Sequence, residues 1–241
     1  MYTTTTKLYQ HEIPEAPQSA VVLQYSLDRV AEWGADFRAS IPSDPPFSVG
    51  VSIGLAPAEP RIQTLALATQ DKVFCLSLRQ SPSPTQCKAL QELFSDIPYL
   101  AGFEFSYTIV LLAHTLGSNV AGYDLSTLAM VSKHRDLTTP GSFLKSKNSS
   151  VFTRRVNDRW DGDVLRSGPN SSGIPRPNHA LRAWFTAMCV TLSYPLIPID
   201  FLSIPGTSAA NMAFSDLLSA QKLSTESIDM PVRFQQVLSM L

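Results

Sequence analysis

Three apolar runs follow one another in the first third of the chain, and their spacing constrains the fold more than any other feature. The runs cover residues 47–55, 61–68 and 72–78, and the first break between them carries Pro57 and Pro60. Short apolar runs bounded by proline and polar residues are typical of strands joined by tight connections. This segment therefore predicts three strands in an antiparallel meander.

Strands and helices alternate on both sides of the meander. The further strands are expected at residues 20–25 and 98–102. The helices are expected at residues 27–38, 83–94, 105–116, 124–133, 180–192 and 208–223, with a short one after Pro231. Hydrophobic residues make up 44% of the 241 residues and charged residues 16%, which is the composition of a chain that buries a core. An α/β domain follows from this order.

Short motifs occur along the chain in a fixed order. The first strand of the meander reads Val49-Gly-Val-Ser-Ile-Gly54, and a later strand and helix read Leu100-Ala-Gly-Phe-Glu-Phe-Ser-Tyr-Thr-Ile-Val-Leu-Leu112. Asp124-Leu-Ser-Thr-Leu-Ala129 and Asn178-His-Ala-Leu-Arg-Ala-Trp184 follow. Together these segments resemble the motifs of the RNase D and Werner-type (DEDD) 3′–5′ exonucleases over residues 20–194. The resemblance implies a ribonuclease-H-like (DnaQ-like exonuclease) mixed sheet flanked by helices.

The resemblance also divides the chain. Residues 1–19 are expected to form an N-terminal tail, residues 20–198 the exonuclease-like domain, and residues 199–241 a C-terminal helical appendage.

Five positions carry the functional residues of that family, and all five are changed here. The family's first Asp and Glu correspond to Ser52 and Gly54, its second Asp to Thr108 and its third Asp to Arg182. The Tyr that orients the attacking water corresponds to Asn178. Hydrolysis by two metal ions needs carboxylate oxygens to hold both ions. The resemblance thus implies a degenerate domain that is not an enzyme and has no metal or cofactor.

A different alignment leaves another reading open. Glu104, Asp124, Asp161 or Asp163 could rebuild a metal site, which would make the chain an active 3′–5′ exonuclease. For Asp124 the more ordinary role is to cap the helix that it begins. Other catalytic motifs are missing from the sequence, and the four histidines are scattered. Among them His179 stands out because it adjoins the changed closing motif.

Charge is spread unevenly along the chain. Residues 1–132 have 7 Lys and Arg against 12 Asp and Glu, a net charge of −5. Residues 133–182 have 10 against 4, a net charge of +6, although the whole chain has only −1. Clustered cations attract phosphate, so this stretch could serve a non-cleaving module that binds single-stranded RNA or DNA. Its candidate contacts are Lys145, Lys147, Arg154, Arg155, Arg159, Arg182 and, for base stacking, Trp160.

A protein-interaction scaffold in a nuclear or nucleic-acid-processing complex is the function that we rank first. A nearly neutral chain is a poor general binder of polyanions, and the end of the appendage carries an apolar stripe that suits a protein partner or a second copy of the chain. The stripe consists of Phe234, Val237, Leu238 and Leu241.

Cysteine usage and hydropathy indicate the compartment. Cys75, Cys87 and Cys189 are far apart and odd in number, which favours reduced thiols. The first residues lack the apolar stretch of a signal peptide, and no run reaches the ~18 apolar residues of a membrane span. We expect an intracellular protein, nuclear or cytoplasmic, without membrane contact.

Overall fold

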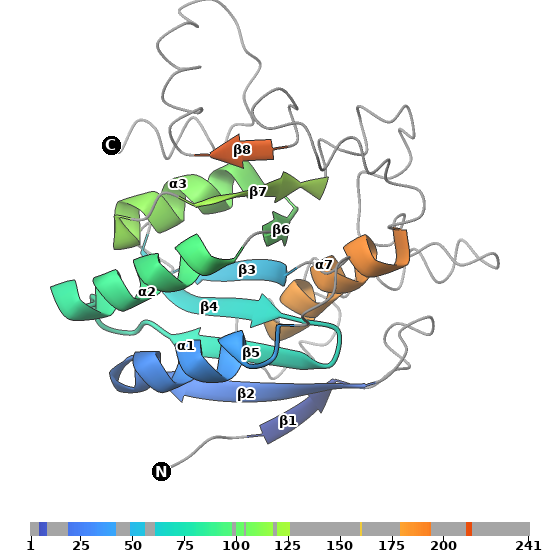
Figure 1. The fold of residues 1–241 in the computed structure, drawn as a ribbon, viewed down its shortest axis with the longest axis horizontal. Coiled ribbons are helices and arrows are strands. Elements are labelled where there is room, and N and C mark those ends of the chain that lie inside the picture. Colours follow the sequence, from blue (N-terminus) through green and yellow to red (C-terminus); the bar gives the residue numbers. More distant parts are fainter. Residues whose placement is uncertain are drawn as a thin grey trace, which may run out of the picture.

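The computed structural model describes residues 5–8, 19–41, 49–55, 61–97, 100–103, 105–117, 120–125, 160, 179–193 and 211–213. The strands in this part of the chain form one mixed sheet in the order β1-β2-β5-β4-β3-β6-β7-β8 (Figure 1). Their bounds are β1 (Thr5–Leu8), β2 (Ala20–Ser26), β3 (Val49–Leu55), β4 (Ile62–Ala68), β5 (Lys72–Ser77), β6 (Leu100–Gly102), β7 (Ala121–Asp124) and β8 (Asn211–Ala213).

The meander predicted from the three apolar runs lies in the middle of this sheet. β3 pairs antiparallel with β4, and β4 pairs antiparallel with β5. β6 and β7 then lie parallel to β3 on its other side. Three meander strands extended by parallel strands beside the first of them make a ribonuclease-H-like sheet. The fold class predicted from the sequence is therefore confirmed.

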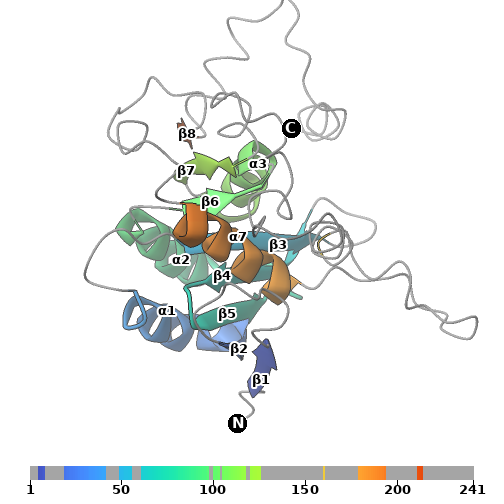
Figure 2. The ribbon, with the colours of Figure 1, turned by 90° about the vertical axis from the view of Figure 1, so that its right-hand side faces the viewer.

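Helices cover both faces of the sheet. The helices α1 (Val30–Arg38), α2 (Pro84–Asp96) and α3 (Phe105–Leu116) pack on one face, and α7 (His179–Ser193) packs on the other. Figure 2 shows α1 and α2 together on one side of the molecule. Strand residues alternate between the two cores: Leu65 and Leu67 of β4 join the first, and Ala66 and Ala68 join the second. Small side chains under α7 let this helix approach the sheet closely.

Local sequence signals account for several element ends. Ser83 begins α2 with a capping box, in which its hydroxyl accepts from the Gln86 amide and the Gln86 side chain accepts from the Ser83 amide. Pro84 occupies the first turn, where a missing N–H leaves no hydrogen bond unmade. A short 3₁₀ turn, Leu27–Arg29, leads into α1.

Three strands were not expected, and one expected helix is wrong in part. β1 pairs with β2 although it belongs to the predicted tail, and β7 precedes the helix expected from Asp124. Residues 211–213, expected within a helix at 208–223, instead form β8 and pair with β7. Periodicity misled here because small and apolar residues such as Met212 and Ala213 suit either element, and the free edge of β7 decides between them. The rest of the appendage lies outside the described residues, and the domain division stays a prediction.

No helix in the described part of the chain is long and apolar enough to cross a membrane. None of Cys75, Cys87 and Cys189 forms a disulfide. Cys189 is buried, whereas Cys75 and Cys87 are partly buried.

Candidate functional site

Three of the five positions named from the sequence, Ser52, Gly54 and Arg182, lie on β3 and α7, which pack against each other. Side chains alternate along a strand, so Gly50, Ser52 and Gly54 share the face of β3 that α7 covers. Gly50 lies against Ala183 and Gly54 lies against His179, so the helix runs opposite to the strand along this contact. Ser52 and Gly54 therefore lie against the first turn of α7, the helix that also carries Arg182.

A hydrogen bond joins the strand to the first turn of the helix. The Oγ atom of Ser52 lies 3.2 Å from Nδ1 of His179, and Ser52 is 8% exposed. Which atom donates depends on the histidine tautomer. In either case the buried hydroxyl has its hydrogen-bond partner within the protein, as buried polar groups require.

The ring of His179 fills the space beside Gly54. A Cβ atom built on Gly54 would lie 2.5 Å from Nε2 and 2.7 Å from Cδ2 of this ring. Real Cβ atoms are not found this close to another heavy atom. No larger side chain fits at residue 54 while the imidazole keeps its position.

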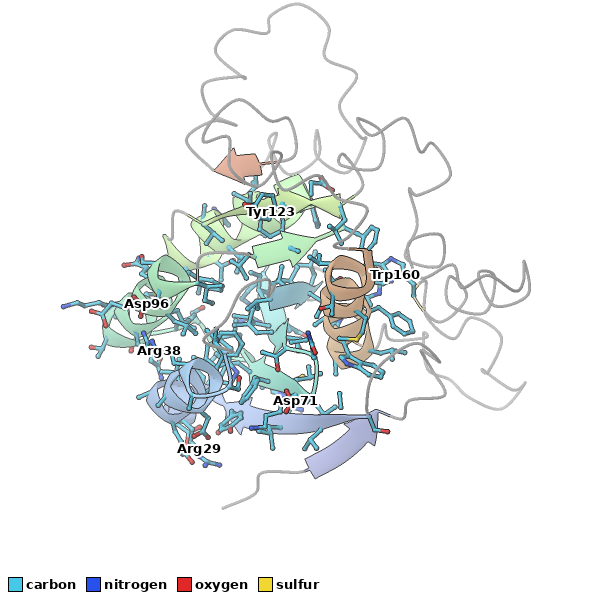
Figure 3. All side chains as sticks on the ribbon, turned by 45° about the vertical axis from the view of Figure 1, so that its right-hand side comes forward. Arg29, Arg38, Asp71, Asp96, Tyr123 and Trp160 are labelled. Carbon is cyan, nitrogen blue, oxygen red and sulfur yellow. The ribbon has the colours of Figure 1, made fainter. Side chains whose placement is uncertain are left out.

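Arg182 lies one turn further along α7 and is turned toward Trp160. Its Nε donates a hydrogen bond of 2.6 Å to the carbonyl oxygen of Trp160, and its guanidinium lies 5.2 Å from the centre of the indole ring. Phe103, just after β6, meets the same indole edge-on with 5.0 Å between ring centres. Figure 3 shows Trp160 beside α7. This cation–π and aromatic contact fixes residue 160 against the start of the helix.

Burial keeps the imidazole neutral at ordinary pH. Desolvation, and to a smaller extent the positive charge of Arg182, lower the pKa of His179 from 6.5 to about 4. A neutral ring next to a guanidinium leaves Arg182 as the only formal charge among Ser52, Gly54, His179 and Arg182.

This arrangement does not fit a divalent metal ion. Such ions take oxygen ligands, chiefly carboxylates that offset their charge. Here Ser52 offers a hydroxyl already bonded to His179, Gly54 offers no ligand, and Arg182 brings a positive charge. No group of three or more His, Cys, Asp or Glu residues that could hold a metal lies within the part of the chain that is described.

The other residues named from the sequence fall in different places. Thr108 is 7% exposed on α3. Asp124 is the last residue of β7, where it pairs with Gly102 of β6. It is 5% exposed and is not without an interaction partner. The remaining candidates lie outside the described residues, and their roles stay predictions: Asn178, Glu104, Asp161, Asp163, Lys145, Lys147, Arg154, Arg155, Arg159, Phe234, Val237, Leu238 and Leu241.

The use of Trp160 in base stacking stays a prediction. Its ring is half-buried and already contacts Phe103 and Arg182. His179, which sequence reasoning only noted for its position, is the residue at the centre of the site. The signal that could have identified it is the pairing of a glycine at residue 54 with a histidine in the closing motif.

No family model and no curated protein matches this chain. Solved structures are similar to it. The Nibbler EXO domain of Aedes aegypti has 18% identity and a TM-score of 0.46, and the match covers 84% of this chain and 94% of that one. An RNase D:GMP complex from Trypanosoma brucei has 16% identity and a TM-score of 0.49, and the match covers 87% of this chain and 65% of that one. The EXD2 exonuclease domain has 16% identity and a TM-score of 0.38, and the match covers 87% of this chain and 97% of that one.

Proposed function

We propose that the domain is a protein-interaction scaffold on an exonuclease-like fold, acting without phosphodiester hydrolysis in a nuclear or RNA-processing complex. The observation that carries this proposal is the contact of Ser52 and Gly54 with His179, beside Arg182. Where two-metal hydrolysis needs carboxylates, this chain has a neutral ring and a cation. The domain can therefore bind a protein partner, while Ser52, Gly54 and Arg182 offer no carboxylate ligands for metal ions.

Charge supports a protein partner over a general polyanion. The chain has a net charge of −1, and residues 1–132 alone have −5. Non-specific nucleic-acid binding depends on many cations that contact phosphates together. The positive stretch at residues 133–182 is local, so we rank the scaffold ahead of a nucleic-acid module.

Affinity capture from an extract of the native organism tests this function. The full chain serves as bait, and each capture is made with and without nuclease treatment. We expect the same protein partners in both captures, because the contacts are direct. Partners that disappear after nuclease treatment would contradict the scaffold and favour nucleic-acid binding.

Removing residues 230–241 tests where a partner binds. Phe234, Val237, Leu238 and Leu241 form the apolar stripe that we assign to a partner or a second copy of the chain. We expect the truncated protein to keep its melting temperature and to lose partner capture or self-association. If the stripe packs on its own domain instead, truncation will cost several kcal/mol, since each fully buried large apolar side chain contributes ~1.5–3 kcal/mol.

Non-cleaving binding of single-stranded RNA or DNA is the second candidate, favoured by the net charge of +6 at residues 133–182. Such binding would weaken with salt by ~0.7 in log K for each phosphate contact. Replacing Arg154 and Arg155 with Glu would abolish it. The matched control replaces Arg79 and Lys88, which are exposed and lie outside the basic stretch, with Glu. Equal losses in both double variants would mean that the basic stretch is not the binding face.

A further inference from the structure

We propose that the imidazole of His179 is a built-in occupant of the place beside Gly54, and that it excludes a divalent cation and its ligands from this end of β3. This inference rests on the proposed function, because it explains how a domain without metal chemistry keeps the metal's place closed. It adds a steric barrier to the missing carboxylates. The two barriers can be separated experimentally.

The first support is the space itself. At Gly54 the nearest atoms to an added Cβ are all atoms of the His179 ring, namely Nε2, Cδ2 and Cε1. No backbone atom stands among these nearest contacts. Since a single side chain fills this place, removing that side chain opens it without moving the helix or the strand.

The second support is that the ring is held in place. Its Nδ1 bonds the nearly buried hydroxyl of Ser52 on the strand. The helix that carries the ring is fixed one turn later, where Ala183 is fully buried against Gly50. The ring is therefore held through its Nδ1 atom and through the helix that carries it, unlike a histidine on an open surface.

The third support is charge. Arg182 lies one turn after His179 on α7, and its positive charge opposes a second positive charge at this ring. A hydrated divalent ion would have to displace the ring and tolerate the guanidinium. Restoring carboxylates alone would leave the ring in the way.

The test restores three carboxylates in two backgrounds. The first variant carries Ser52→Asp, Gly54→Glu and Arg182→Asp with His179 kept, and the second adds His179→Ala. Melting temperature is measured with and without Mn²⁺, since an ion that binds only the folded state raises it. We expect Mn²⁺ to raise the melting temperature of the second variant only. An equal Mn²⁺ effect in both variants, or none in either, would overturn the inference.

A steric test does not depend on metal binding. Gly54→Ala should lower the melting temperature, and this loss should disappear in a His179→Ala background. Gly34→Ala is the matched control, because an added Cβ there meets nothing closer than 3.8 Å. The control should not lower the melting temperature. A loss from Gly54→Ala that is the same in both backgrounds would show that the ring is not what fills the place.

These outcomes are distinct from failure of the proposed function. Mn²⁺ binding or nuclease activity of the unaltered protein would contradict the proposed function itself. The variant pattern described above concerns only the role of His179.

Discussion

Gly50 and Gly54 lie four residues apart on the same face of β3, yet α7 needs each of them for a different reason. A Cβ atom on Gly50 would fall on the backbone carbonyl oxygen of Ala183 and would lie 2.5 Å from the amide nitrogen of Ala187. A Cβ atom on Gly54 would meet only the side chain of His179 among its nearest atoms. One glycine is required by backbone packing and the other by a neighbouring ring.

The contact between β3 and α7 is therefore limited by different atoms at Gly50 and at Gly54. At Gly50 the strand and the helix touch through main-chain atoms, so residue 50 of this chain has no room for a side chain. At Gly54 the fit depends on a single replaceable side chain. The packing of this strand against this helix is therefore fixed by main-chain atoms at Gly50 and by a side chain at Gly54.

The largest predicted effect concerns Gly50, where β3 meets the backbone of α7. Gly50→Ala should cost about 3 kcal/mol in unfolding free energy, because neither strand nor helix backbone can yield without losing its packing. Urea denaturation measures this loss. Unlike the loss predicted for Gly54→Ala, it should persist when His179 is replaced by Ala. Rescue by His179→Ala would show that the two glycines are not different in kind.

The next effect is a pH dependence of the unfolding free energy, caused by His179 beside Gly54. The pKa of His179 is lowered from 6.5 to about 4 by burial and by Arg182, so the unfolded chain binds a proton that the folded chain does not. The unfolding free energy therefore decreases by about 1–3 kcal/mol as pH falls from about 6.5 to about 4. Above pH 6.5 this contribution to stability is retained in full. His179→Gln should flatten this part of the stability curve. An unchanged curve would mean that the ring is not buried as described.

The smallest effect concerns the contact that holds Trp160. Arg182→Met removes the hydrogen bond to the Trp160 carbonyl and the cation–π contact, and should cost about 1 kcal/mol. Arg38→Met is the matched control, because its ion pair with Asp96 is exposed and contributes little. In the Arg182 variant the pKa of His179 should also rise, which NMR titration can follow. Equal losses in both variants would contradict a specific role for Arg182.

Much of the fold could be predicted from the sequence because its signals are local. The apolar runs of the meander and the pattern of the helix at residues 105–116 are formed by residues close together in the sequence. The bounds of β3, β4, β5 and α3 accordingly lie within two residues of the predicted ones. The edge strands could not be predicted in this way. β1 and β8 are short and exist by pairing with β2 and β7, which is a tertiary contact that no local pattern announces.

The site was predictable in part for a similar reason. The motif order placed Ser52, Gly54 and Arg182 at one site, and in the structure Ser52 and Gly54 contact His179, three residues before Arg182 on α7. The ring's place beside Gly54 depends on residues 125 positions apart and on the direction of α7 against β3. The sequence shows the glycine and the histidine, but only the structure shows that they meet.

Nuclease activity of the purified protein tests the central claim most directly. Single-stranded RNA and DNA labelled at the 5′ end are incubated with the full chain and either Mg²⁺ or Mn²⁺. We expect no shortening from the 3′ end with either ion, because Ser52, Gly54 and Arg182 supply no carboxylate for it. Metal-dependent shortening that survives repurification and disappears with Glu104→Gln or Asp124→Asn would contradict this, and would place a working metal site elsewhere on the fold.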